Sequence, residues 1–202
     1  MWEALCRRVA RVTNPWIRAL LERVLSERES TLRVCPAAVT VHHAYPGGLL
    51  EHILSLATLG EGVASHYGVD PDLLLAGAVL HDIGKLDELS HGDAITYTRD
   101  GNLVGHIGLG LILVRGAIRS LPGFPDELRG RIEHMVVSHH GSRHLGSPVE
   151  PMTEEAFILS ALDDLDARLH QVRRHQQEAE GEGEFTAFHP RLRRVLLKPS
   201  GR

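Results

Sequence analysis

The sequence predicts an all-α fold, a bundle of irregular helices. Apolar residues recur at helical spacing through most of the chain, and stretches rich in glycine and proline separate these segments. The composition, 43% hydrophobic and 24% charged over 202 residues, is that of a globular protein able to bury one substantial core. We therefore expect one domain over 1–202, with N-terminal helices (1–28), a central core (29–179), and a linker with a C-terminal segment (180–202).

The first half of the chain shows the helical pattern most clearly. Apolar positions over 3–28 predict two helices divided at Asn14-Pro15, since proline fits the first turn of a helix. A loop is expected over 29–46. The next helices are expected from Gly47-Gly48 to about Tyr67, and from Pro71, behind an Asp70 cap, to about Leu86.

The second half begins with a polar, turn-rich stretch. Residues 97–103 predict a small β-hairpin around Asp100-Gly101, within 95–104. The remaining elements are expected in this order: helices at about 105–120 and 125–138, a loop over 141–151, a helix over 153–179, a solvated linker over 180–184, and a short helix within 185–197.

Charge and cysteine content narrow the class of protein. A net charge of −4 excludes an overall basic surface for polyanions. No apolar run reaches the length of a membrane span, and arginines interrupt the apolar N-terminal stretch, which excludes a signal peptide. Cys6 and Cys35 are expected to be reduced thiols, so we expect a cytoplasmic protein with no membrane partner.

The dipeptide His81-Asp82 is the most informative feature of the chain. It follows the apolar run LLLAGAVL (73–80), so it is expected at the end of a buried helix. A carboxylate there is costly unless it is paired or bound to a metal. Lys85 follows three residues later.

Further ligand types lie on apolar helices or at helix ends. Each has an ordinary alternative: a hydrogen-bonded core histidine for His52, a helix-start residue for His106, a helix-end residue complementing the dipole for His139-His140, and a solvated acid for Asp163. Together they predict a metal site. Imidazole with carboxylate suits Mn, Fe, Ni, Co or Zn, one or two ions, and does not suit a Mg site made only of oxygens.

The order His, His-Asp, His, His-His, Asp resembles that of HD-domain metal-dependent phosphohydrolases. The chain is most similar to the HD domain of YhaM-type 3′–5′ exoribonucleases over about residues 14–198. Those enzymes usually carry an N-terminal OB-fold that binds single-stranded nucleic acid, whereas a short helical segment precedes the HD region here. We therefore expect a low affinity for long RNA. The similar motifs are HHAYPGGLLEH (42–52), LHDIGK (80–85), the stretch 97–106, EHMVVSHHG (133–141), GSPVEPMTEEA (146–156) and LDDLDA (162–167).

The resemblance assigns the ligands of the central, metal-binding part. It implies one metal bound by His52, His81, Asp82 and Asp163. It implies a second metal bound by His106, His139 and His140, with Asp82 as a bridge. The pattern Asp-x-x-Asp-Ala selects Asp163 over Asp164, and Asp166 is expected to orient a ligand or an arginine.

Such a site would hydrolyse phosphoesters, since paired cations activate a water molecule and clamp phosphoryl oxygens. Lys85, with Asp82 as the other catalytic residue, could neutralise phosphate charge; the alternative is an exposed helix-end lysine. Arg143 and His144 could contact phosphate or sugar, or form only a polar loop. His43 and Tyr45 could contact a base, or only pack their loop onto the core.

Three functions follow, in order of expectation. The first is a 3′–5′ exonuclease acting on short single-stranded RNA or oligonucleotides. The second is a hydrolase of small nucleotides, such as a nucleotidase or a dinucleoside polyphosphate or cyclic nucleotide phosphodiesterase; the sequence after His-His, GSRHLGSP, argues against the cyclic-di-GMP class. The third is a non-catalytic nucleotide sensor or RNA-decay adaptor. The apolar N-terminal helices could also serve a homo-oligomer interface.

Overall fold

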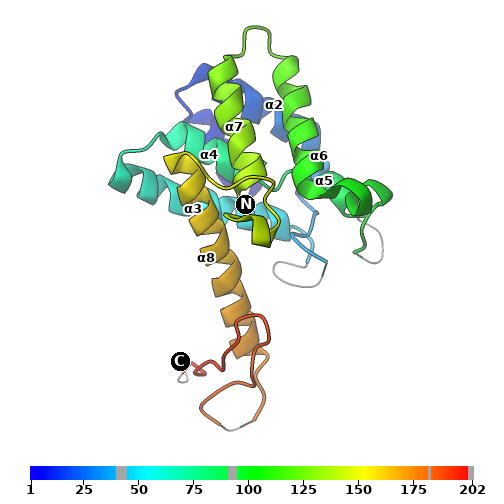
Figure 1. Ribbon diagram of the computed structural model, residues 1–202, viewed down its shortest axis with the longest axis vertical. Helices are drawn as coiled ribbons and strands as arrows, with labels where there is room; N and C mark the ends of the chain where they lie inside the picture. Colours follow the sequence, from blue (N-terminus) through cyan, green and yellow to red (C-terminus); the bar gives the residue numbers. More distant parts are fainter. Residues whose placement is uncertain (40–44, 91–94, 182, 200–202) are drawn as a thin grey trace.

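The computed structural model describes residues 1–39, 45–90, 95–181 and 183–199. Within this part the chain is all-α, as predicted, and its only β pairing is a set of isolated bridges (Figure 1). The elements are α1 (Trp2–Ala10), α2 (Pro15–Leu32), α3 (Gly48–Tyr67), α4 (Pro71–Leu80), α5 (Lys85–Glu88), α6 (Arg99–Arg119), α7 (Asp126–Ser138), the 3-10 turn η1 (Arg143–Leu145) and α8 (Glu154–Gln177).

The N-terminal helices divide where the sequence predicts. The Asn14 side chain accepts hydrogen bonds from the backbone of Trp16 and Ile17, and Pro15 occupies the first turn of α2. Helix α2 continues to Leu32, beyond the expected end at 28. The apolar faces of α1 and α2 belong to the common core and pack on α3, α4 and α6, so this chain itself covers them.

Helix α4 lies at the centre of the bundle, in contact with α2, α3, α7 and α8. Its Asp70 cap accepts hydrogen bonds from the backbone of Asp72 and Leu73, as expected. From Leu73 onward almost every residue of α4 is buried. The residues that follow Leu80 therefore lie in the interior of the protein.

The predicted helix to Leu86 is interrupted. Helix α4 ends at Leu80, residues 81–84 form turns, and α5 begins at Lys85. A methyl group added to Gly84 would lie 2.0 Å from the His106 carbonyl oxygen, so glycine is needed for this turn to pass against α6.

The hairpin predicted at 97–103 is wrong, because a helix begins there. The Thr98 hydroxyl caps α6 by accepting a hydrogen bond from the Gly101 backbone at 2.9 Å. Asp100-Gly101 thus lies in a first helical turn, and Gly101 packs against the Glu88 backbone. The helix predicted from 105 is present after a kink at Gly105, whose φ is 73°.

The lower half of α8 projects from the bundle, and the C-terminal segment folds back along it (Figure 1). The short helix predicted within 185–197 is wrong. The segment instead forms a turn with bridges between Phe185 and Leu197 and between His189 and Arg194. Pro190 disfavours helix at the residue before it, and Arg193 adopts a left-handed φ of 53° that reverses the chain. We call residues 185–198 the C-terminal strap.

Among the described helices, only α6 is long and apolar enough to cross a membrane by length and composition. Core helices of soluble proteins pass the same test. Here α6 packs on α2, α5 and α7, so this is weak evidence for a span.

Candidate metal centre

Helix ends and buried helix faces bring all the predicted metal ligands together. Helix α3 supplies His52, the turn after α4 supplies His81 and Asp82, α6 supplies His106, the end of α7 supplies His139 and His140, and α8 supplies Asp163. They form two groups, one of His52, His81 and Asp163 and one of His106, His139 and His140, and within each group the ligand atoms all lie within 4.8 Å of one another.

The first group is the more deeply buried. His52 and His81 have no solvent exposure, and their Nε2 atoms lie 3.3 Å apart. Asp163 Oδ1 lies 3.1 Å from His52 Nε2 and 4.0 Å from His81 Nε2. Two imidazole nitrogens and a carboxylate oxygen thus face one point, an arrangement suited to a divalent transition metal.

Asp82 lies between the two groups and presents one oxygen to each. Its Oδ2 is 3.4 Å from His81 Nε2 and 3.9 Å from His52 Nε2. Its Oδ1 is 3.5 Å from His106 Nε2 and 3.6 Å from His139 Nε2. A carboxylate in this position can join two cations.

Three buried polar atoms at the second group and on the adjacent Asp82 have no hydrogen-bond partner among the described residues. These atoms are Asp82 Oδ1, His106 Nε2 and His139 Nε2. Leaving such atoms unpaired costs about 1–3 kcal/mol each, so native proteins usually satisfy them. A cation held among them would satisfy all three, and the residues therefore fit a second metal ion.

The other ring nitrogen of each histidine has an acceptor. The Nδ1 atoms of His81, His139 and His140 lie 3.0, 2.8 and 2.8 Å from the backbone oxygens of Ala78, Val136 and Leu145, respectively. His52 Nδ1 lies 2.8 Å from Asp166 Oδ2, and His106 Nδ1 lies 3.2 Å from Glu88 Oε1. Each Nδ1 therefore carries the hydrogen of the neutral ring, which leaves the Nε2 lone pair free to bind a metal.

The acidic residues of LDDLDA have distinct environments. Asp163 faces His52, whereas Asp164 is exposed and pairs with Arg168 at 2.7 Å. Asp166 accepts a hydrogen bond from the Ser55 hydroxyl at 2.5 Å while it contacts His52 Nδ1. This geometry agrees with the expectation that Asp166 orients a ligand.

Lys85 is buried, with 9% of its surface exposed, so the alternative of an exposed helix-end lysine is wrong. Its ammonium group donates to Asp82 Oδ2 at 2.6 Å. Burial alone would lower the pKa of Lys85, but the charge and hydrogen bond of Asp82, together with the charges of Asp163 and Glu88, raise it. Burial likewise opposes ionisation of Asp82, yet Lys85, His81 and His106 together hold its pKa well below the usual range.

The histidines differ in charge preference. Burial alone would lower the pKa of His52, but hydrogen bonds to Asp163 and Asp166 raise it to about 9. Burial and the charge of His81 instead lower the pKa of His139 well below its ordinary value. Without a cation, the carboxylates thus attract a proton to His52, as they would attract a metal in its place.

The predicted substrate contacts are less closely tied to the centre. Arg143 and His144 are exposed on η1, directly after the His139-His140 pair. The Tyr45 hydroxyl donates to Glu51 at 2.8 Å and its ring lies 6.3 Å from that of His170, so Tyr45 packs against α3 and α8. His43 lies outside the described residues.

A cleft of about 370 Å³ opens onto the centre. Its lining residues are Asp82, Lys85, His139, His140, Leu145, Ser160, Asp163, Asp164, Ala167 and Arg191. Sequence reasoning missed Arg191, and it also missed Glu88 and Ser55. Glu88 accepts hydrogen bonds from both the backbone and the ring of His106, but no ligand spacing marks any of the three.

Comparison with known proteins places these residues in one family. The family model described as HD domain matches residues 49–168, more than half of the chain. The chain is 34% identical over 187 residues to the 3′-5′ exoribonuclease YhaM of Bacillus subtilis (strain 168) and 35% identical over 187 residues to that of Bacillus licheniformis. The matches cover 92% of this chain, which spans about 59% of the length of each relative. No solved structure matches the chain.

Proposed function

The chain belongs to the HD-domain family, whose members are metal-dependent phosphohydrolases, and from this premise we propose that it is a 3′–5′ exonuclease for short single-stranded RNA. The family membership supports phosphoester hydrolysis. Both Bacillus relatives are named as 3′-5′ exoribonucleases, which supports RNA and attack from the 3′ end. The free thiols of Cys6 and Cys35 suit a cytoplasmic location.

The centre would hold two divalent transition-metal ions. His52, His81 and Asp163 would bind one ion, and His106, His139 and His140 would bind the other. Asp82 would bind both. Ions held in this way supply a nucleophile from water at neutral pH and neutralise charge on phosphoryl oxygens.

The protein side chains would contribute position and charge. Glu88 and Asp166 hold the imidazole rings of His106 and His52 in their orientations. Lys85 fixes Asp82 and lines the cleft, where its ammonium group can neutralise charge that develops on the phosphate or its leaving oxygen. Arg143 and His144 are exposed on η1, whose Leu145 lines the cleft, and they are available to a sugar or phosphate.

The division of Asp82 between the two ligand groups carries the proposal. One oxygen faces His81 and the other, Oδ1, faces His139 Nε2. These last two atoms are buried, and neither has a hydrogen-bond partner among the described residues. In a histidine cluster with only a structural role, these buried atoms would be expected to have hydrogen-bond partners. In a two-ion hydrolytic centre they are the atoms that bind the metal.

A product profile tests the proposal. The protein is loaded with Mn, Ni or Co and offered single-stranded RNA, the same RNA with a blocked 3′ end, single-stranded DNA and a set of small nucleotides. We expect mononucleotides from RNA with a free 3′ end and little product from the blocked RNA. The Asp82→Ala variant, purified in the same way, controls for contaminating nucleases. Internal cleavage, or turnover of small nucleotides with no attack on RNA, would contradict the proposal.

A further inference from the structure

The C-terminal strap is anchored to the last turns of α8. The His175 Nε2 atom lies 2.8 Å from the Ala187 carbonyl, and Gln176 donates to the Leu197 carbonyl at 2.8 Å. The His175 and His189 rings pack edge to face with centroids 4.7 Å apart. These contacts fix the turn of the strap against α8, so the position of the residues on that turn is determined.

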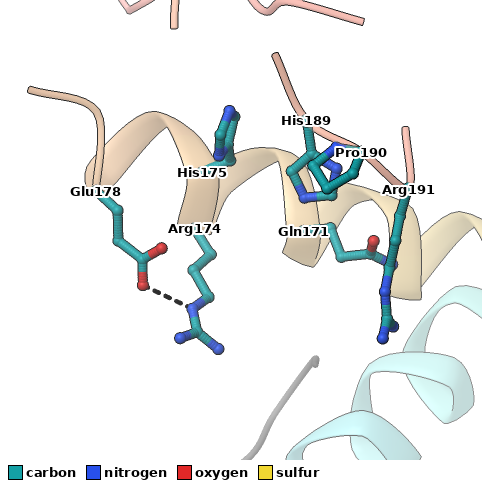
Figure 2. Close-up of a pocket in the computed structure, with 7 residues that line it drawn as sticks. All are labelled: Gln171, Arg174, His175, Glu178, His189, Pro190 and Arg191. Carbon is teal, nitrogen blue, oxygen red and sulfur yellow. Dashed lines mark hydrogen bonds and ion pairs between the residues drawn. The ribbon is translucent and has the colours of Figure 1, made fainter. Parts of the chain in front are cut away.

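Arg191 lies on this turn and reaches the metal cleft. Figure 2 shows its side chain extending beside Gln171, with the guanidinium group pointing away from His189 and Pro190. Arg191 lines the cleft together with Ala167 and Asp163 of α8. Ala167 and Gln171 follow Asp163 by about one and two helical turns, so the strap extends the cleft along α8 away from the ligands.

Arg191 differs from the other basic residue that lines the cleft, because its guanidinium group is unpaired within the described part of the chain. Lys85 is the other lysine or arginine in its lining, and Asp82 holds the Lys85 ammonium group at 2.6 Å. Asp164 is paired with Arg168. No side-chain hydrogen bond or ion pair joins Arg191 to the described part of the chain, and Arg191 is solvent-exposed. Its guanidinium group is therefore free to bind an anion that enters the cleft.

We propose that Arg191 binds a second phosphate of the substrate, next to the one that is cleaved, and so selects oligonucleotides over substrates with a single phosphate. The proposal rests on the proposed function. The scissile phosphate would occupy the metal centre, and Arg191 lies farther along the cleft. A guanidinium group binds phosphate through two parallel hydrogen bonds, which suits a strand held at one point outside the centre.

Kinetics and binding of the Arg191→Gln variant test this role. The substrates are a trinucleotide and bis(p-nitrophenyl) phosphate, a diester with a single phosphate. We expect Arg191→Gln to raise KM for the trinucleotide about tenfold and change kcat less than threefold, as for a charge-assisted hydrogen bond near solvent. The loss in kcat/KM should be several-fold smaller on the single-phosphate diester.

Binding gives a readout that does not depend on turnover. The Kd of a phosphorothioate trinucleotide should rise about tenfold in Arg191→Gln, and the slope of log Kd against log salt should fall by about 1. Arg191→Lys should recover part of the affinity, since it keeps the charge and loses the fork. Arg173→Gln is the matched control, because Arg173 is exposed on α8 and lies outside the cleft lining.

The possible failures are distinguishable. If the wild type hydrolyses the trinucleotide and Arg191→Gln matches Arg173→Gln in KM, Kd and salt slope, the role of Arg191 is overturned. An equal loss on both substrates would also overturn it, since it would show no second phosphate contact. If the wild type hydrolyses no phosphodiester with any metal, the proposed function fails, while the binding measurement still reports on Arg191.

Discussion

Asp82 Oδ1 and His139 Nε2 lie 3.6 Å apart in the interior, and neither atom has a hydrogen-bond partner among the described residues. The His139 ring is fixed by its bond to the Val136 carbonyl, which leaves its Nε2 lone pair facing the carboxylate oxygen. Two acceptors facing each other repel unless a cation lies between them. The pair therefore indicates metal binding independently of the family resemblance.

Replacing Asp82 tests the bridge. The wild type should carry roughly one to two transition-metal equivalents, and Asp82→Ala should lose most of them because this carboxylate faces both ligand groups. Elemental analysis after metal loading and dialysis measures the content. Asp164→Ala is the control, since Asp164 is exposed and pairs with Arg168, and it should keep the wild-type content. Full occupancy in Asp82→Ala would falsify the bridging role.

Replacing a ligand of the second group should remove one ion only. His106→Ala or His140→Ala should lower the metal content by about one equivalent and leave the group of His52, His81 and Asp163 partly filled, because the groups share only Asp82. His66→Ala, an exposed histidine of α3, should change nothing. A wild type that never binds more than one ion would show that His106, His139 and His140 contact water or phosphate instead.

The sequence was sufficient for the parts of this site that depend on local patterns. Asn14-Pro15 and Asp70-Pro71 mark helix starts because their capping side chains lie next to the backbone they serve. His81-Asp82 could be recognised because it ends an apolar helix. The choice of Asp163 over Asp164 came from the family pattern, and the exposure and ion pair of Asp164 agree with it.

The parts that were missed depend on contacts between distant segments. Thr98 is compatible either with a strand or with a helix cap. In the structure it caps a helix, and the first turn of that helix packs through Gly101 against the Glu88 backbone. Glu88 contacts His106 across 18 positions of sequence, and Arg191 reaches the cleft only because the strap folds back on α8. No local periodicity encodes such pairings.

The Asp166 carboxylate should act through His52. Because it lies 2.8 Å from His52 Nδ1, it fixes the ring orientation and raises the basicity of Nε2. Asp166→Ala should weaken metal affinity about 10–100-fold, and Asp166→Asn should weaken it less because a hydrogen-bond acceptor remains. Titration against a competing chelator measures the affinity. Asp164→Ala again serves as the control, and an equal loss there would argue against a specific role for Asp166.

Acid should weaken the ion pair between Arg115 of α6 and Glu133 of α7. Arg115 donates to both oxygens of Glu133, at 2.9 and 2.6 Å, and these bonds lower the pKa of Glu133 although burial opposes them. A lowered pKa adds stability that is present above the unfolded value, near 4.5, and is lost as pH falls through the folded value. Glu133→Gln should therefore lower the urea midpoint at pH 7, and the difference should shrink below pH 4.5. Glu127→Gln, exposed on the same helix, should show no such difference.

Lys85 should contribute to the chemical step. Its buried ammonium group lines the cleft and touches Asp82, so it can stabilise charge that develops on the phosphate. Lys85→Ala should lower kcat roughly 10²–10³-fold, the loss expected for one electrostatic donor, with metal content and fold retained. A contact made equally in the ground state would appear mainly in KM, and a role limited to fixing Asp82 would appear as lost metal. Steady-state kinetics and elemental analysis of the same samples separate these roles.

Unchanged kcat in Lys85→Ala would remove the residue from the mechanism. Lys198→Ala, on the strap, controls for the loss of a lysine away from the cleft.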